Sequence, residues 1–468
     1  MKHEDGKNSF SSPEPLSLIK EWGDDIVLIE NPNYIYARYD ICPLAPKIQN
    51  ARDGIVAIVQ DMDGTTTTTE GLCLHSLENM VRQYTGRLTA QDWKGLDPNQ
   101  DYPYIIGNST TRHVEYLIGA YESSVRLDCF QKAYLKASLL SIAFGRDEMR
   151  RREVLSNLKH FELSELLDDH RVRSFIMTAA NANQIFFPEQ LETELQKWAN
   201  LICFKSFADR VRAAIDIYYQ RYHEILFYIE HHDYDAIKAA LPIDSERLIE
   251  PMPGVAIMLA LVKGWLGREL DVFADELIQS IVEQPLIKYQ SENFTNAADR
   301  LQRVGRYFEQ NPVRIAVVTS SIAYEAKIVL KEVFRTMCAQ IQDWKIKAEK
   351  KERLLQKFSD HNLVFDEVIT ASDSSEIRLK PHRDLYSLAL HRLGIAKDDF
   401  DKVVGFEDSE SGVIAIRAAG VGLCVAVPFA DTRSHRLQNA SYILYGGLPE
   451  AMVVHQLFLN ENTLKQIN

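Results

Sequence analysis

The stretch IVAIVQDMDGT, residues 55–65, contains a clear indication of the fold. Residues 55–60 are mostly apolar and rich in β-branched side chains, which is typical of a strand buried on both faces of a parallel sheet. The strand runs into Asp61 and Asp63, and Gly64 then permits a sharp exit. Carboxylates at positions i and i+2 of an extended segment project to the same side. The stretch therefore predicts a buried strand that presents two acids at its carboxyl end.

Three later stretches have the same form. Apolar runs at residues 315–318, 364–370 and 403–406 also end in polar groups. Helical periodicity marks the segments between them, at 324–341, 384–393 and 411–419. This alternation predicts an α/β core, a Rossmann-like doubly wound parallel sheet. Ligands of such sheets bind beyond the carboxyl ends of the strands, so the polar residues that end these strands form the candidate site.

The stretch from about residue 70 to residue 250 has helical patterns and few β-branched runs. Helices are predicted at 73–84, 112–121, 129–144, 152–167, 189–198 and 208–229. We interpret this stretch as a large α-helical cap inserted after the first strand, with the turn signal PMPG marking the return to the core. The predicted parts are an N-terminal extension packed on the body (1–50), a discontinuous core (51–69 and 251–468) and the cap (70–250). A run of five threonines, residues 65–69, is the one low-complexity feature.

The charge balance excludes some partners. The 468 residues include 53 Lys and Arg against 66 Asp and Glu, which gives a formal charge of −13. An acidic surface repels nucleic-acid backbones and anionic membranes, so neither is an expected partner, although a locally positive site could still bind phosphate. The longest apolar run, residues 255–262, is too short to span a membrane.

The cysteines and the first residues bear on location. Six cysteines lie far apart and form no CxxC motif, which favours a reducing compartment. Residues 1–15 carry acids and lack the apolar core of a secretory signal. We therefore expect a cytoplasmic protein, while the sequence leaves its oligomeric state open.

The first acid pair has two chemical interpretations. Neighbouring acids such as Asp61 and Asp63 are costly unless a cation or a proton lies between them. Mg²⁺ prefers oxygen ligands and would fit there. One acid could equally serve as a nucleophile and the other as a proton donor. An exposed acidic turn is the alternative without function.

Polar groups end the other predicted strands. The hydroxyls and backbone N–H groups of residues 319–321 could cradle an anion, or simply cap a helix. Lys380 could neutralise a phosphoryl group, or lie at the surface. Glu407 and Asp408 could complete a Mg²⁺ site, or cap a helix. Together these groups supply the nucleophile, the acid/base, the positive charge and the metal ligands that phosphoryl transfer needs.

Four motifs resemble those of the haloacid dehalogenase-like superfamily of phosphotransferases. They are DMDGT (61–65), VVTSS (317–321), KPHRDLY (380–386) and GFEDSESGVIAIRAAG (405–420). The last two are similar to the branch that holds β-phosphoglucomutase and small sugar-phosphate or polyol-phosphate phosphatases. PMPGVAIMLALVKGW (251–265) resembles the stretch where the family's cap returns to the core.

The resemblance implies a role for each catalytic residue. Asp61 would be the nucleophile that forms an aspartyl-phosphate, and Asp63 the general acid/base. Thr319 and Lys380 would bind the phosphoryl group.

The resemblance also implies a metal site and contacts to the substrate. Mg²⁺ would be held by Asp61, the backbone carbonyl of Asp63, and Asp408, with Glu407 ligating or assisting. Further phosphate and substrate contacts would come from Gly64, Thr65, Ser320 and Arg112, the last from a stretch (104–112) that resembles the cap's substrate-facing loop.

The chain departs from the family's pattern in several places. Thr68 and Cys73 stand where the family often has an acid and a histidine, while Glu70 fits. We interpret His75 as a histidine on a helix face and the arginines at 150–152 as a solvated helix face. The cap past about residue 145 and the segments 266–312 and 336–362 are longer than the resemblance explains.

The leading hypothesis is a Mg²⁺-dependent phosphatase that hydrolyses a small phosphorylated metabolite, with the cap closing over the site. The closest alternative is a phosphomutase similar to β-phosphoglucomutase, which would return the phosphoryl group to a sugar. A homologue that binds phosphate without turnover is a further alternative. A signalling receiver is disfavoured, because its acid pair precedes its nucleophile and it has no place for a large cap.

Overall fold

The computed structural model describes residues 25–31, 36–106, 109–179, 182, 184–241, 248–284, 286, 289, 291–373, 378–429, 432 and 435–466. Residues 1–24 and 32–35 of the expected extension lie outside the described residues, as do Gly107 and Asn108 of the stretch 104–112. The chain forms two compact units. The core unit comprises residues 1–67, 251–323 and 333–468, and the helical unit comprises residues 68–250 and 324–332.

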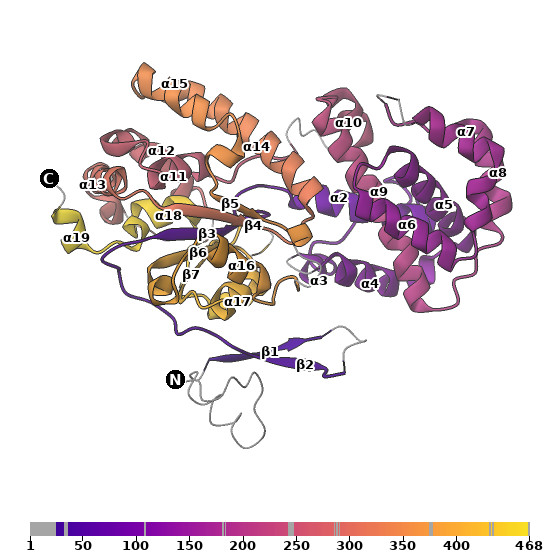
Figure 1. Cartoon of the computed structure of the whole chain (residues 1–468), viewed down its shortest axis with the longest axis horizontal. Coiled ribbons are helices and arrows are strands. Elements are labelled where there is room, and N and C mark those ends of the chain that lie inside the picture. The colour runs from indigo at the N-terminus through magenta and orange to yellow at the C-terminus, as the bar shows by residue number, and fades with distance from the viewer. Residues whose placement is uncertain are drawn as a thin grey trace. The chain divides into compact units, whose positions relative to one another are not determined.

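The core unit contains a six-stranded sheet in the order β5-β4-β3-β6-β7-β8, with every neighbouring pair parallel (Figure 1). The strands are β3 (Ala57–Asp61), β4 (Arg314–Val318), β5 (Glu367–Ile369), β6 (Val403–Glu407), β7 (Leu423–Ala426) and β8 (Tyr442–Ile443). The chain adds strands on one side of β3 and then on the other. The carboxyl ends of β4, β3 and β6 therefore meet at a topological switch point. The predicted α/β fold class is confirmed.

Helices cover both faces of this sheet (Figure 1). On one face, the strand residues Val59 and Ile369 share a buried cluster with Leu385 and Ile416. The helices on this face are α16 (Asp384–Arg392) and α17 (Glu410–Ala418). The other helices of the unit include α11 (Val255–Val262), α12 (Ala274–Val282), α13 (Ala297–Gln310), α15 (Ala348–Lys357), α18 (Gly447–Val453) and α19 (Glu461–Lys465). Helix α14 (Ala323–Asp343) is divided between the two units, because its residues 324–332 belong to the helical unit. All five residues of β3 are buried, which explains why its first three are apolar.

A hairpin precedes the core sheet. Strands β1 (Ile26–Glu30) and β2 (Tyr39–Pro43) pair antiparallel and form a separate two-stranded sheet. The fully buried guanidinium of Arg417, on α17, donates a hydrogen bond of 3.0 Å to the carbonyl of Ala45 and pairs with Asp25 at 2.5 Å. These contacts hold the segment around the hairpin to the core unit.

The described part of the helical unit is built from helices. They are α2 (Glu70–Thr85), α3 (Tyr102–Ile105), α4 (Thr110–Ala120), α5 (Leu127–Phe144), α6 (Glu148–His160), α7 (His170–Ala179), α8 (Glu189–Ala199), α9 (Phe207–Glu230) and α10 (Tyr234–Ala240). Helix α9 packs against α2, α4, α5 and α6, and a capping box between Ser206 and Asp209 begins it. One predicted helix, at 152–167, is divided, because Glu162 has a φ of 61° after α6 ends.

One interpretation of a helix face needs correction, and the environment of His75 can be described in more detail. Arg150 is buried, not solvated, because it faces α9 and pairs with the buried Asp216, whereas Arg152 is exposed as expected. His75 is partly buried, and Arg221 donates a hydrogen bond of 3.4 Å to its Nε2. Burial, and then the charges of Arg221 and Arg82, lower the pKa of His75 to about 3, so this histidine stays neutral at physiological pH.

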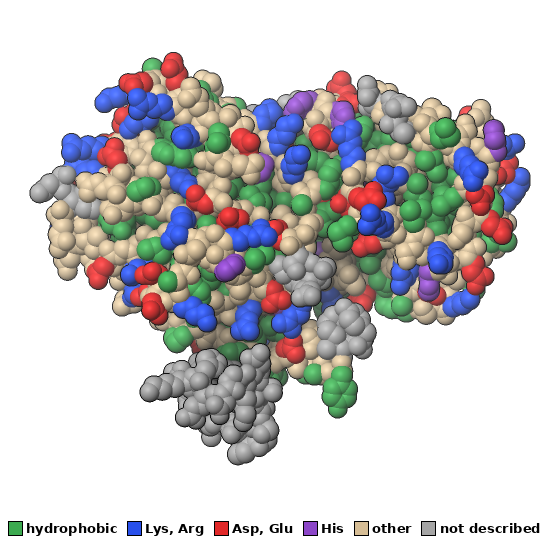
Figure 2. All heavy atoms as spheres, viewed as in Figure 1, with side chains coloured by type: hydrophobic (Ala, Val, Ile, Leu, Met, Phe, Trp, Pro, Cys, Tyr) green, Lys and Arg blue, Asp and Glu red, His purple; other side chains and the backbone are tan. Residues whose placement is uncertain are grey.

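The surface and the helix lengths bear on possible partners. Figure 2 shows acidic and basic side chains interspersed over the face in view, in keeping with a formal charge of −13. Within the described ranges, no helix is both long and apolar enough to cross a bilayer.

Candidate active site

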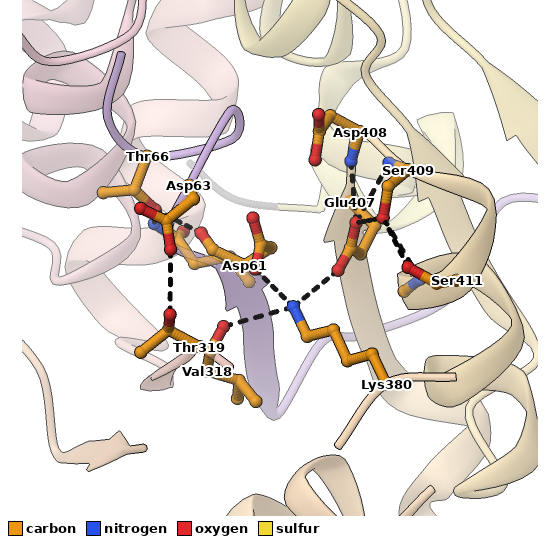
Figure 3. A network of polar contacts seen from close by, with 12 residues as sticks. Asp61, Asp63, Thr66, Val318, Thr319, Lys380, Glu407, Asp408, Ser409 and Ser411 are labelled. Atoms are coloured by element: carbon orange, nitrogen blue, oxygen red, sulfur yellow. Dashed lines mark hydrogen bonds and ion pairs between the residues drawn. The ribbon is translucent and has the colours of Figure 1, made fainter. Parts of the chain in front are cut away.

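The candidate site lies at the carboxyl ends of three adjacent strands. Asp61 ends β3, Thr319 follows β4, and Glu407 ends β6. Lys380 comes from the loop before α16 and reaches the same place (Figure 3). Parallel strands in this register bring residues that are hundreds of positions apart to one edge of the sheet, as the sequence predicted.

Lys380 lies between two carboxylates. Its Nζ contacts the carboxylate of Asp61, lies 2.6 Å from Oε1 of Glu407, and donates a weaker hydrogen bond of 3.4 Å to the carbonyl of Val318. Burial alone lowers the pKa of Lys380, but the charges of Asp61 and Glu407 outweigh it and raise that pKa above its usual value. Burial raises the pKa of Asp61, and the lysine opposes that shift. Lys380 is therefore a buried cation in contact with the candidate nucleophile.

Glu407 is held by five hydrogen bonds from within the chain. Its Oε1 accepts from Nζ of Lys380 at 2.6 Å and from the hydroxyl of Tyr386 at 3.1 Å. Its Oε2 accepts from the backbone N–H groups of Asp408 and Ser409 at 3.0 and 3.1 Å, and from the Ser409 hydroxyl at 3.0 Å. Both oxygens thus accept hydrogen bonds, which fix the Glu407 carboxylate in its place beside Lys380. Sequence reasoning missed Tyr386 and Ser409, although both stand inside the quoted motifs.

Asp63 turns toward the end of β4. Its Oδ2 accepts hydrogen bonds from the hydroxyls of Thr319, at 2.9 Å, and Ser321, at 3.4 Å (Figure 3). The backbone N–H of Ser321 donates in turn to Oγ1 of Thr319 at 2.9 Å. Ser321 therefore contacts Asp63, whereas Ser320, which was expected to bind phosphate, is exposed beside this network.

The turn after β3 brings its backbone against Asp408. Gly64 has a φ of +87°, and a Cβ added there would lie 2.5 Å from Oδ2 of Asp408 and 2.9 Å from the ring of Phe429. Only glycine allows that approach without displacement. The next residue, Thr65, is 1% exposed, and its hydroxyl has no hydrogen-bond partner within the described residues.

Three of the four predicted metal ligands converge. Asp61, Glu407 and Asp408 are buried, and each offers a carboxylate oxygen within 4.8 Å of the others. Close, buried oxygen donors of negative charge are what Mg²⁺ prefers, so the residues fit that ion. The side chain of Asp63 instead faces Thr319, and its predicted contribution is the backbone carbonyl.

Arg112 belongs to the helical unit. It lies on α4, where its half-exposed guanidinium is 3.6 Å from the carboxylate of Glu115, one turn along the helix. Its assignment to substrate contact stays a prediction.

These observations define a class: an α/β fold whose switch point carries a buried acid–lysine cluster. No family model and no curated protein matches the chain. It is similar to solved members of the haloacid dehalogenase-like superfamily and its β-phosphoglucomutase branch, with over 80% of this chain and over 90% of each other chain aligned.

Three of these solved structures illustrate the similarity. CbbY from Rhodobacter sphaeroides, in complex with phosphate, is 17% identical over 85% of this chain and 96% of its own, with a TM-score of 0.36. A β-phosphoglucomutase homologue from Thermotoga maritima is 15% identical over 86% and 98%, with a TM-score of 0.33. A haloacid dehalogenase-like hydrolase from Streptococcus pneumoniae is 12% identical over 84% and 95%, with a TM-score of 0.29. Because these identities and TM-scores are low, the function of this chain has to be inferred from its own residues.

Proposed function

We propose that the protein is a Mg²⁺-dependent phosphatase that hydrolyses the monoester of a small phosphorylated metabolite through an aspartyl-phosphate on Asp61. One observation carries this proposal: a buried lysine cation touches a buried aspartate at the sheet's switch point, with two further acids beside them. This arrangement supplies a nucleophile and positive charge for a dianionic phosphoryl group.

The first half-reaction transfers the phosphoryl group to the protein. A carboxylate oxygen of Asp61 attacks phosphorus, an O–P bond forms, and the ester P–O bond breaks. Asp63 gives its proton to the departing alkoxide, which leaves as the alcohol. Lys380 is a cation beside the attacking carboxylate, so it offsets the repulsion between two anions.

The second half-reaction restores the starting state. Water attacks the phosphorus of the aspartyl-phosphate while Asp63 takes up the proton, and the bond from phosphorus to Asp61 breaks. Phosphate leaves, and both acids return to their first protonation states. The contacts of Asp63 with Thr319 and Ser321 would hold it in place through both steps.

Asp61 and Asp408 would hold Mg²⁺ together with the backbone carbonyl of Asp63. When bound, the ion supplies charge that neutralises the phosphoryl oxygens. We assign Glu407 to orienting Lys380, since its two oxygens already accept five hydrogen bonds from the chain. We also place the protein in a reducing, cytoplasmic compartment, which fits six cysteines that are all free.

The test is turnover of p-nitrophenyl phosphate and of a panel of phosphorylated metabolites with Mg²⁺. Asp61→Asn should abolish release of phosphate, whereas Asp398→Asn, an exposed control in the same unit, should leave it unchanged. An Asp61→Asn variant that retains full activity would refute the mechanism. Isomerisation of a sugar phosphate without free phosphate would replace the phosphatase by the phosphomutase.

A further inference from the structure

Apart from Thr65, which the resemblance assigns to phosphate contact, the threonine run after the acid pair has so far no role in the proposed chemistry. Four of its five residues are almost completely buried: Thr65, Thr66, Thr67 and Thr69, each at most 3% exposed. A buried hydroxyl is costly unless it is hydrogen-bonded. The hydrogen-bond partners of the Thr66 hydroxyl therefore bear on what this residue does.

Thr66 points back to the candidate nucleophile (Figure 3). Its hydroxyl donates a hydrogen bond of 2.5 Å to the backbone carbonyl of Asp61. The backbone of Thr66 is fixed on both sides: its N–H donates to the carbonyl of Met62 at 2.9 Å, and its carbonyl accepts from the N–H of Met252 at 3.0 Å. These bonds fix the backbone from which the hydroxyl extends.

Gln60 completes this contact from the other side. It precedes Asp61 in the central strand and is fully buried among apolar strand residues. Its Nε2 donates a hydrogen bond of 2.7 Å to Oγ1 of Thr66. That bond occupies the threonine oxygen as an acceptor, so the hydroxyl proton is directed to Asp61. The result is a hydrogen-bond relay that runs from the Gln60 amide through the Thr66 hydroxyl to the Asp61 carbonyl.

Stability alone explains Gln60 poorly. Within the described residues its Oε1 is buried without a hydrogen-bond partner, which carries a desolvation penalty. An apolar side chain of similar length would avoid that penalty, as the three apolar residues before Gln60 in the strand do. The amide therefore costs stability, and it lies directly beside the nucleophile.

We infer that Gln60 and Thr66 are positioning residues that fix the peptide carrying Asp61 and so aim its carboxylate for attack. This inference rests on the proposed function and deepens it. In-line attack requires the reacting oxygen to be placed closely, and an error of about 1 Å can reduce the rate about 100-fold. We assign neither residue a contact with the phosphoryl group; each acts through the backbone carbonyl of Asp61.

Two substitutions of Thr66 separate positioning from packing. Thr66→Val keeps the branched shape and loses the hydroxyl, whereas Thr66→Ser keeps the hydroxyl and loses a methyl group. We expect Thr66→Val to lower kcat about 100-fold with KM within about 2-fold, and Thr66→Ser to stay within about 3-fold of wild type. A residue that only packs would give the reverse order, and that result would overturn the inference.

Gln60→Met provides an independent test, because methionine matches glutamine in length but its thioether has no hydrogen to donate to Thr66. We expect kcat to fall about 10-fold, the effect of one hydrogen bond, with an unchanged or raised melting temperature. The double variant Gln60→Met/Thr66→Val should be no slower than Thr66→Val, since both belong to one relay. If the fold-losses in kcat of the two single variants multiply in the double variant, the inference is overturned. If Thr66→Val does not fold, full activity of Gln60→Met overturns it.

The wild-type protein, assayed with p-nitrophenyl phosphate and Mg²⁺, distinguishes the two proposals. Absence of wild-type turnover refutes the proposed function itself. Wild-type turnover together with undiminished Thr66→Val and Gln60→Met refutes only the relay.

Discussion

Replacing Arg150 with methionine should destabilise the helical unit far more than replacing Arg152, its neighbour in the same basic run. The Arg150 side chain is 8% exposed and pairs with Asp216, which is fully buried and also accepts hydrogen bonds of 2.9 and 3.0 Å from Asn157. Arg152 is exposed and makes a 3.2 Å pair with Glu148 one turn away. The two variants remove the same charge from one helix, so the comparison isolates burial.

The magnitude follows from the uncompensated charge. Removing one partner of a buried ion pair costs about 3–5 kcal/mol, whereas an exposed pair contributes about 0.3–0.5 kcal/mol. For a unit of this size, the loss at Arg150 lowers the melting temperature by about 6–20 °C. The measurements are thermal unfolding of the full chain and hydrogen exchange at the amides of α6 and α9, where protection should fall in Arg150→Met alone.

The dependence on pH has a definite sign. Burial raises the pKa of Asp216, and Arg150 opposes that shift. A group whose pKa is higher in the folded state binds a proton more readily there, so it favours folding as the pH falls. In Arg150→Met no guanidinium counteracts the effect of burial, so the pKa of Asp216 rises further and the buried carboxylate is protonated as the pH falls. The difference in unfolding free energy from wild type should therefore narrow between about pH 8 and pH 5. Equal stability of Arg150→Met and Arg152→Met at pH 8 would refute this reasoning.

Three further predictions concern the site. Lys380→Met should lower kcat by more than about 1000-fold, because it removes the cation that lies between two buried carboxylates and offsets the repulsion during attack. Steady-state kinetics would check this, and a loss under tenfold would contradict it. Gly412→Ala should abolish turnover, because the added Cβ would overlap the Glu407 carboxylate. Gly71→Ala is the control, since it has open space around it and should leave turnover unchanged. Measuring the release of phosphate distinguishes the two variants. Removal of divalent ions with EDTA should abolish turnover and added Mg²⁺ should restore it; activity that survives exhaustive chelation would exclude the metal site.

Much of the local structure could be predicted from residue patterns. The runs at 55–60, 315–318 and 403–406 match β3, β4 and β6 to within two residues at each end, whereas only residues 367–369 of the run at 364–370 form a strand. The predicted helix at 384–393 differs from α16 by one residue. The reason is that buried parallel strands and amphipathic helices leave distinct periodicities in the chain. The shortest elements escaped prediction: β8 has two residues, too few to show any period.

Other features depend on contacts between distant segments. Arg150 and Arg152 are equivalent in sequence, and only the approach of α9 buries one and leaves the other in water. In the same way, Ser321 rather than Ser320 bonds to Asp63, because the backbone after β4 turns that hydroxyl toward β3.

The residue pattern alone indicates the strand–helix alternation, the acids and the lysine at the strand ends, and hence the edge of the sheet where chemistry would occur. The pairing of these groups follows from the fold: Lys380 donates a hydrogen bond to Glu407, and Gln60 donates one to Thr66, whose hydroxyl donates to the carbonyl of Asp61. Periodicity reports which face of an element is buried, whereas a hydrogen bond requires two atoms within about 3 Å. That distance is set by the packing of segments far apart in the chain.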